Sequence, residues 1–525
     1  MRLIYRHILL LLSSRSFGQG MWREFAAVAV AFVLTLGVCL SFSACSSDSD
    51  RVSALIAQAA RDPELRNEQT FNELSSLILA RPEKYKGFLT PSGGVDVAKL
   101  QAAYDAAAGK GDGDSEWNLS EYGGALSGDL RLRLMLERSG SMTGYDRGAR
   151  STGDFKRVLS EMITRFPGRR NDDGSILVVN DGLYGYPGTF DTFLQDKDIF
   201  SSTASIGNPA FTDFRKIFEN SLTDTVPERV TVLVTDLIYS PRGAAGMTAE
   251  KIFNEEGALA SYLFEKHLDK SMLIVRLSSD FSGTYYPYAD SKPFQFNGQR
   301  PYYLIITGSA AAMSRLRGSD KYASFTDFRS LPGYEQQYFF NRRPLPLKWW
   351  SLMPRANATQ GDYTLAGGDS ESGAHSLKDA RPARDTGEML FTVAADMSGI
   401  PAEADYLLDK SNYRVDSDAP VEILEIKAAD KVEKNPRNQR YLKRATHLIT
   451  LRLSGKSTPD DVKVTLLNRL PDWVKQGSSK DDRSPYGSFA SRTFGLEPFL
   501  QGVYNAYYGT AAIPAFTSFD IKFTH

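Results

Sequence analysis

The sequence has 525 residues, with 62 Lys plus Arg against 63 Asp plus Glu and a formal net charge of −1. The length is too great for one hydrophobic core and predicts about three domains of ~150 residues each. The balanced charge, without a long block of one sign, argues against nucleic acid as a partner. The two cysteines, Cys39 and Cys45, provide no disulfide framework, and the five histidines are not spaced as zinc ligands.

Residues 1–45 have the pattern of a signal peptide. Arg23 precedes an uncharged and mostly apolar run from Phe25 to Ala44. The run ends at Cys45 and resembles a bacterial lipoprotein signal, in which small residues precede a cysteine that is lipidated after cleavage. This resemblance implies a lipid anchor on Cys45 and a place in the cell envelope, as an outer membrane lipoprotein that some bacteria export to the surface. A plain transmembrane anchor is the alternative, because about 20 apolar residues can span a bilayer.

Residues 46–128 are expected to form a polar tether followed by a helical segment. A run of serines and aspartates follows Cys45, and helical patterns then cover Val52 to Ala80 and Val97 to Ala108. The sequence leaves open whether this segment packs on the rest of the chain or holds it away from the membrane.

Residues 129–335 alternate between short apolar strands and amphipathic helices. Apolar residues recur at helical spacing from Phe155 to Phe166, and an almost continuous apolar run from Val230 to Val234 is typical of a buried strand. We therefore predict an α/β domain with a mostly parallel, Rossmann-like central sheet flanked by helices. The expected strands begin near residues 131, 175, 230, 272 and 302.

The remainder of the chain, from residue 336, divides into two parts that differ in composition and pattern. Residues 336–386 are predicted to be a linker or loop region, because Ala356 to Thr386 is rich in Gly, Ser, Asp and Ala and has few large apolar residues. Residues 387–525 contain several strand patterns without clear helices between them, so we expect a β-rich, sandwich-like C-terminal domain. A helix from Phe494 to Tyr508 and a last strand near Phe519 to Phe523 complete it.

Oxygen-bearing side chains follow two of the predicted strands. Glu137, Ser139 and Ser141 come directly after the strand that begins at Arg131, and Thr235 and Asp236 end the strand from Val230. Because parallel strands place their ligands at their carboxyl ends, these groups are expected to meet at one edge of the sheet. Turns that cap the next helix are the alternative explanation for such residues, and for Asp181, in Asn-Asp-Gly, a turn is the expectation.

The order of these groups resembles the von Willebrand factor type A domain over residues 129–331. In that family Asp-x-Ser-x-Ser after the first strand, a Thr from a second loop and an Asp ending the fourth strand form a metal-ion-dependent adhesion site. The resemblance implies that Mg²⁺, or alternatively Mn²⁺, is held by five residues and completed by a partner's carboxylate. They are Glu137, Ser139, Ser141, Asn208 and Asp236.

Three departures from the family pattern stand in this sequence. Glu137 replaces the Asp, and its extra methylene moves the carboxylate outward. Asn208 takes the place of the Thr, with Thr203 and Thr212 as nearby candidates. Leu237 follows Asp236, where Gly is frequent.

An aromatic stretch from Phe281 to Tyr303 is expected to be a long loop between the last two strands. Exposed aromatic side chains can anchor an interface or stack on sugars, which makes Tyr285, Tyr286 and Tyr288 candidate partner-binding residues. Packing of this loop against a neighbouring domain, with Trp349 and Trp350 as its contacts, is the alternative.

Three functions follow from these patterns. The first is a non-enzymatic binding or adhesion protein, anchored in the envelope by lipid, that engages a protein partner with the help of Mg²⁺. A structural lipoprotein of an envelope assembly that has lost the metal is the second. A metal-assisted hydrolase with Ser139 or Ser141 as nucleophile is the third, and it lacks a histidine near any motif. No catalytic residue is assigned, and carbohydrate is kept as a further ligand class.

Overall fold

The computed structural model describes residues 51–524, apart from residues 82, 90–94, 110–116, 118, 120–127, 146–152, 170–174, 240–245, 289–291, 343, 355–360, 367, 369–372, 456, 510 and 512. The predicted signal peptide and Cys45 lie outside the described residues. Within the described part of the chain, no helix combines the length and apolar character needed to span a bilayer.

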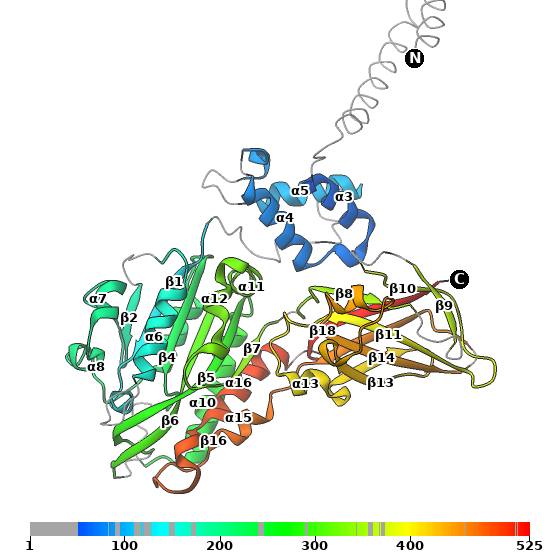
Figure 1. Ribbon diagram of the computed structural model, residues 1–525. Coiled ribbons are helices and arrows are strands. Elements are labelled where there is room, and N and C mark those ends of the chain that lie inside the picture. The colour runs from blue at the N-terminus through cyan, green and yellow to red at the C-terminus, as the bar shows by residue number, and fades with distance from the viewer. Residues whose placement is uncertain are drawn as a thin grey trace, which may run out of the picture.

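Three helices, α3 (Arg51–Arg61), α4 (Glu68–Ala80) and α5 (Val97–Ala108), form a small N-terminal bundle around their own apolar core. They lie above the rest of the chain in Figure 1. Glu64 joins this bundle to the C-terminal sandwich, with 2.9 Å from its carboxylate to the Lys522 ammonium and 4.0 Å to the His375 ring. The helical segment therefore packs on the folded body.

The following α/β part contains a seven-stranded sheet in the order β3-β2-β1-β4-β6-β5-β7. Its strands are β1 (Arg131–Glu137), β2 (Ile176–Val179), β3 (Leu183–Gly185), β4 (Arg229–Thr235), β5 (Lys270–Tyr285), β6 (Phe294–Ser309) and β7 (Tyr334–Phe340). Its helices are α6 (Asp154–Arg165), α7 (Phe190–Gln195), α8 (Ile199–Ser202), α9 (Phe214–Leu222), α10 (Ala249–Glu265), α11 (Ala310–Gly318) and α12 (Ala323–Thr326).

The sheet is mixed, which corrects the expectation of a mostly parallel one. Strand β1 pairs in parallel with β2 and β4, whereas β4–β6, β5–β6, β5–β7 and β2–β3 are antiparallel. The difference arises because β5 and β6, strands of 16 residues each, are consecutive in the chain and joined through residues 286–293 as a hairpin. A short connection between neighbouring strands forces them to run antiparallel.

Both faces of this sheet are covered by helices. The side chains of β1 alternate between the two faces, since Leu132, Leu134 and Leu136 are buried on one face with the apolar side of α6, and Met135 lies on the other. Helices α11 and α12 also cover the first face, and α9 and α10 cover the second. The α/β domain therefore has three layers.

The C-terminal part is a sandwich of two sheets, as expected. Their strand orders are β12-β15-β18-β10-β9 and β13-β14-β11-β8. The rings of Phe391 in β11 and Phe523 in β18 meet between them with centroids 5.9 Å apart. The strands are β8 (Trp349–Leu352), β9 (Asp362–Ala366), β10 (Ser376–Arg381), β11 (Glu388–Asp396), β12 (Tyr413–Ser417), β13 (Val421–Ala428), β14 (His447–Ser454), β15 (Asp461–Leu467) and β18 (Ala515–Thr524), with helices α13 (Ala404–Leu408) and α14 (Gln439–Leu442).

Residues 336–386 differ from the linker that their composition predicts. They contain the end of β7 and the whole of β8, β9 and β10. Short strands with polar residues on their exposed face carry too few apolar side chains to stand out in the sequence, so composition alone does not reveal them.

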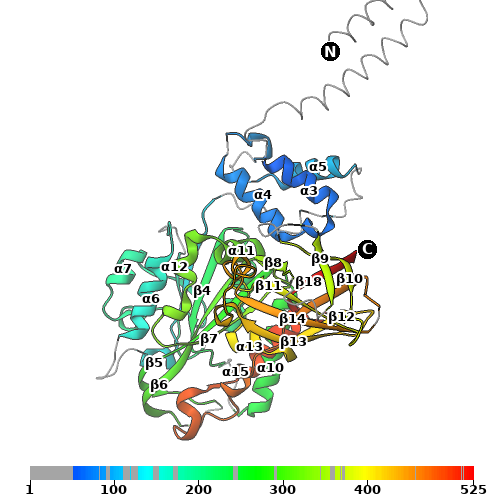
Figure 2. The ribbon, with the colours of Figure 1, turned by 45° about the vertical axis from the view of Figure 1, so that its right-hand side comes forward.

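Between β15 and β18 the chain returns to the α/β domain. This return segment, residues 472–509, comprises α15 (Asp472–Gln476), β16 (Ser478–Ser479), β17 (Thr493–Phe494) and α16 (Leu496–Tyr508). Helix α16 packs directly on α10, where Gly502 lies so close to Gly257 that an added Cβ would be 2.3 Å from the Gly257 carbonyl oxygen. Figures 1 and 2 show this helix beside α10 rather than within the sandwich. The predicted terminal helix thus exists, but it belongs to the α/β layer.

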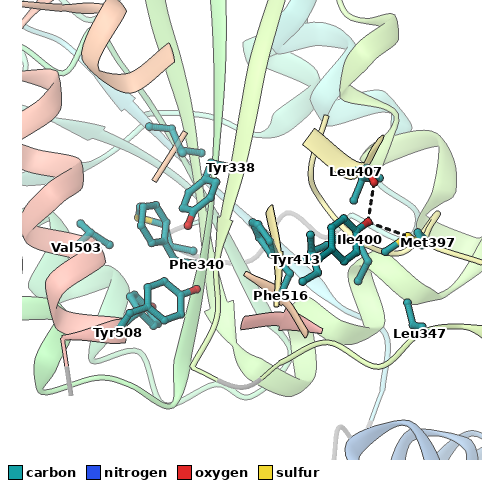
Figure 3. Close-up of a cluster of buried hydrophobic side chains, with 14 of the residues drawn as sticks. Tyr338, Phe340, Leu347, Met397, Ile400, Leu407, Tyr413, Val503, Tyr508 and Phe516 are labelled. Carbon is teal, nitrogen blue, oxygen red and sulfur yellow. Dashed lines mark hydrogen bonds between the residues drawn. The ribbon is translucent and has the colours of Figure 1, made fainter. Parts of the chain in front are cut away.

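One apolar cluster connects the α/β domain with the sandwich. Figure 3 shows Tyr338 and Phe340 of β7 facing Val503 and Tyr508 of α16, with Phe516 of β18 next to them. The cluster continues into the sandwich through Met397, Ile400, Leu407 and Tyr413. Because this interface is as apolar and as buried as a domain core, the two parts form one body.

Candidate functional site

The carboxyl ends of β1 and β4 lie next to each other in the sheet. Leu136 is paired with Val234, so Glu137 at the end of β1 comes opposite Thr235 at the end of β4. The β5–β6 hairpin projects at this same edge, which Figure 1 shows at the side of the sheet remote from the N-terminal helices. The strand-end residues named from the sequence therefore occupy one region.

Glu137 is the centre of a buried hydroxyl network. Its side chain is 1% exposed. Thr212 donates a hydrogen bond to Glu137 Oε1 at 2.6 Å, and the Thr235 hydroxyl donates to Oε2. The Ser139 hydroxyl lies near this carboxylate and opposes the rise of its pKa. Both carboxylate oxygens are thus held by hydroxyl donors.

Ser139, Ser141 and Asp236 complete the cluster. The two serine Oγ atoms are 3.1 Å apart, and the Ser141 hydroxyl lies near the carboxylate of Asp236 and lowers its pKa. Asp236 Oδ1 accepts a further hydrogen bond from the Ile238 amide at 3.1 Å. Two carboxylates and four hydroxyls, the latter from Ser139, Ser141, Thr212 and Thr235, therefore meet within one buried network.

The two carboxylates perturb each other. Burial, reinforced by the charge of Asp236, raises the pKa of Glu137 from 4.5 to about 8. Burial also raises the pKa of Asp236, against the opposing effects of the Ser141 hydroxyl and the positive charge of Arg300. Within the described residues neither carboxylate forms an ion pair. A bound cation would relieve the unfavourable burial of both charges.

Leu237, which follows Asp236, stands where Gly is frequent in the family that the sequence resembles. Leu237 has φ 55°, the left-handed backbone region that glycine adopts at least cost. Its amide donates to Thr235 Oγ1 at 2.8 Å, and its side chain is 1% exposed within the core beneath α9. The turn that follows β4 thus has the backbone conformation that glycine favours, although the residue there is a buried leucine.

Asn208 does not join the network, although the resemblance described above implied that it would be a metal ligand. Its Oδ1 accepts from the Ala210 amide at 3.0 Å in a local turn, and its side chain is exposed. Thr212, four residues further on, takes the hydroxyl position instead. Asp181 lies in the tight turn between β2 and β3, where the Asn180 amide donates to the Gly182 carbonyl at 3.0 Å, and its carboxylate accepts from the Asn208 amide of the next loop at 2.8 Å.

The aromatic stretch 281–303 is part of the β5–β6 hairpin and not a long loop. Tyr285 is 1% exposed and donates to Asp482 at 2.7 Å, and Tyr288 stacks on Phe494 with centroids 4.5 Å apart. Neither tyrosine has a ring free to anchor a partner. The hairpin packs against the return segment, rather than against Trp349 and Trp350 as the alternative supposed.

Tyr286 differs from the other two tyrosines because its side chain is 49% exposed. Its ring lies over Gly140, so that a Cβ added to that glycine would be 3.0 Å from Cε2. Gly140 separates Ser139 from Ser141. Tyr286 is therefore an exposed aromatic ring at the edge of the hydroxyl and carboxylate cluster.

Arg300 and Asp482 were not identified from the sequence. The Arg300 guanidinium is buried, donates to the Arg492 carbonyl at 2.9 Å and lies 4.2 Å above the Phe489 ring. It supplies the positive charge that moderates the pKa of Asp236. Contacts between β6 and a segment almost 200 residues later leave no local pattern, apart from a lone arginine within β6, just before its apolar run.

The donor chemistry of the cluster fits a hard divalent cation. Mg²⁺ prefers oxygen ligands, and neutral hydroxyls combined with carboxylates satisfy that preference. Ser139, Ser141 and Asp236 would hold the ion, with Thr212 beside them and Glu137 oriented by its two threonines. The described residues hold no group of three His, Cys, Asp or Glu side chains placed to share a metal ion, so hydroxyl oxygens would have to complete the ligand set here.

Comparison of the chain with protein-family models, with curated proteins and with solved structures gives no match. The kind of ligand that this site can bind is therefore inferred from its own residues.

Proposed function

We propose that this chain is a binding protein that engages a protein partner at the carboxyl ends of β1 and β4, with Mg²⁺ or Mn²⁺ as the cofactor. The observation that carries this proposal is the pair of buried carboxylates, Glu137 and Asp236, surrounded by hydroxyl groups and without an ion-pair partner among the described residues. Such a pair is unfavourable unless a cation binds or a proton neutralises it.

The arrangement also supports a von Willebrand factor type A-like domain. The Ser-Gly-Ser turn follows the first strand, Thr212 comes from a second loop, and Asp236 follows the fourth strand. This is the order of groups that the family resemblance requires. The bound ion would supply a positive centre for an acidic side chain of the partner, and Tyr286 would add an aromatic contact at its edge.

The position of the site suits an anchored binding protein. The hairpin and the site lie at the end of the α/β domain remote from the N-terminal helices (Figure 1). A lipid on Cys45, which precedes those helices in the sequence, would therefore leave the site facing away from the membrane. The envelope location and the lipid anchor are part of this proposal.

Titration with Mg²⁺ and Mn²⁺ tests the metal. Protein spanning residues 46–525 should release or absorb heat on binding and melt at a higher temperature, since a ligand of the native state stabilises it. Asp236→Asn should abolish both effects. Asp181→Asn is the control, because that carboxylate follows the neighbouring strand β2 and hydrogen-bonds to the Asn208 amide and the Tyr184 hydroxyl, neither of which belongs to the cluster. Absence of heat and of a melting shift in the unmodified protein would refute metal binding.

A metal-free structural protein of an envelope assembly is the second candidate. It is favoured by the closed hydrogen bonding of Glu137, whose two oxygens already have donors, and by the contact between Ser139 and Ser141. In this case a protonated Glu137 would replace the cation as the neutralising element. A hydrolase receives no such support, since none of the histidines in the described part of the chain joins the cluster.

A further inference from the structure

We propose that a second binding site, specific for a saccharide without negative charge, lies between β7 and the sandwich. A pocket of about 770 Å³ occurs there. Its walls come from β7, from the segment around α13, from the start of the return segment and from Phe516 of β18. This volume is within the range of about 300–1,000 Å³ found for small-molecule sites, which often lie between domains.

The floor of the pocket is held in place by contacts of its own. The Tyr406 hydroxyl donates to the Leu467 carbonyl at 2.7 Å, and its ring meets Phe516 edge-on at 6.0 Å. Asn412 Nδ2 donates to the Tyr406 carbonyl at 3.1 Å, and Tyr338 is buried against Asn468. A pocket with fixed walls binds without the entropic cost of ordering them.

Several polar side chains on the walls have hydrogen-bonding capacity to spare. Gln336, Gln337 and Gln476 each carry an amide that can both donate and accept, and Trp473 adds an indole N–H. Within the described residues no side-chain hydrogen bond of these four is present. Gln336, Gln337 and Trp473 are half-buried, and all three line the pocket.

The charges of the pocket exclude anionic ligands. Asp405, Asp409 and Asp472 line it together with one guanidinium, that of Arg469. A fourth carboxylate, Glu403, is already paired with an arginine outside the pocket at 2.9 Å. The resulting negative potential opposes phosphates and uronic acids.

A saccharide satisfies these requirements together. Each sugar hydroxyl is both a donor and an acceptor, as are the amides, and carboxylates accept from further hydroxyls. The half-buried Trp473 ring and the Tyr406 ring offer apolar surface for the C–H face of a sugar. A purely apolar ligand would leave the amides without partners. The site is separate from the strand-end cluster and does not depend on its function.

Saturation-transfer NMR on protein spanning residues 46–525 tests the proposal with cellobiose, diacetylchitobiose, glucuronic acid and trilysine as probes. We expect transfer to at least one neutral disaccharide and none to glucuronic acid. The double substitution Gln336→Ala/Gln337→Ala, and separately Trp473→Phe, should each weaken binding about tenfold, the equivalent of one lost hydrogen bond. Gln295→Ala, on the hairpin, is the control and should bind as the unmodified protein does.

Three results would overturn the proposal. The first is the absence of transfer to either neutral disaccharide. The second is transfer that both pocket variants leave unchanged while they keep the melting temperature of the unmodified protein. The third is binding of trilysine without any saccharide, which would assign the pocket to basic peptides.

Discussion

The contact between α10 and α16 can be tested by adding one methyl group to α16 with the substitution Gly502→Ala. Gly502 in α16 packs against Gly257 in α10, and a Cβ at position 502 would lie 2.3 Å from the Gly257 carbonyl oxygen and 3.0 Å from Ala260 Cβ. Because the nearer atom belongs to the backbone, no side-chain rotation relieves the clash, and the helices must move apart. Overpacking of a well-packed core costs about 1–3 kcal/mol, and a backbone clash belongs to the upper end of that range.

Replacement of a helical glycine by alanine also gains about 1 kcal/mol of helix propensity. Gly502→Ala should therefore lower the free energy of unfolding by about 2 kcal/mol in total. Gly318→Ala is the matched control, since that helical glycine has no atom within 4 Å of an added Cβ. Urea unfolding followed by tryptophan fluorescence measures both. Equal stability changes for the two variants would refute the close packing of α16 on α10.

Three further predictions concern buried polar and aromatic groups. Burial raises the pKa of Glu256 well above 4.5, so its stabilising contribution is complete below pH 4.5 and is lost as the pH rises toward the folded-state pKa, by about 1.4 kcal/mol per pH unit. Glu256→Gln should remove this pH-dependent loss of stability. A stability difference between this variant and the unmodified protein that stays constant from pH 4 to 8 would contradict the prediction. Thr212→Val leaves Glu137 Oε1 without its donor and should lower the free energy of unfolding by about 1–3 kcal/mol in urea; an unchanged unfolding midpoint would show that this hydrogen bond contributes nothing. Phe489→Ala removes the ring beneath Arg300 and should cost about 3–5 kcal/mol by the same measurement, whereas a loss typical of an exposed side chain would disprove that the return segment is anchored there.

The helices and the first strands could be predicted because their signals are local. The spacing of Phe155 to Phe166 and the alternation of Leu132, Leu134 and Leu136 depend on which face each residue presents to the core. The direction of β6 could not be predicted in the same way, because a continuous apolar run is equally compatible with parallel and antiparallel neighbours. The return of α16 to the α/β domain is a tertiary contact that the sequence of the helix does not record.

The candidate site was also predicted only in part. Glu137, Ser139, Ser141 and Asp236 meet because strand ends align at one edge of a sheet, which is a rule of topology. The choice of Thr212 over Asn208 depends on a local turn in the loop, where the Ala210 amide donates to the Asn208 side-chain oxygen. Such a turn follows from side-chain geometry that residue type and spacing do not determine.

The hairpin tyrosines show how exposure depends on distant parts of the chain. Tyr285 and Tyr288 are covered by the return segment, and Tyr286, between them, is exposed. Alternation along the hairpin would place Tyr285 and Tyr286 on opposite faces. Which face becomes buried was decided by a segment that lies about 200 residues further along the chain.

The most direct measurement of the central claim is a crystal structure of protein spanning residues 46–525 grown in excess Mn²⁺. An anomalous difference peak among Ser139, Ser141 and Asp236, with the two serine hydroxyls turned toward it, is the expected result. Density without such a peak, with Ser139 and Ser141 still bonded to each other, would contradict the account and leave a protonated Glu137 as the neutralising element of the site.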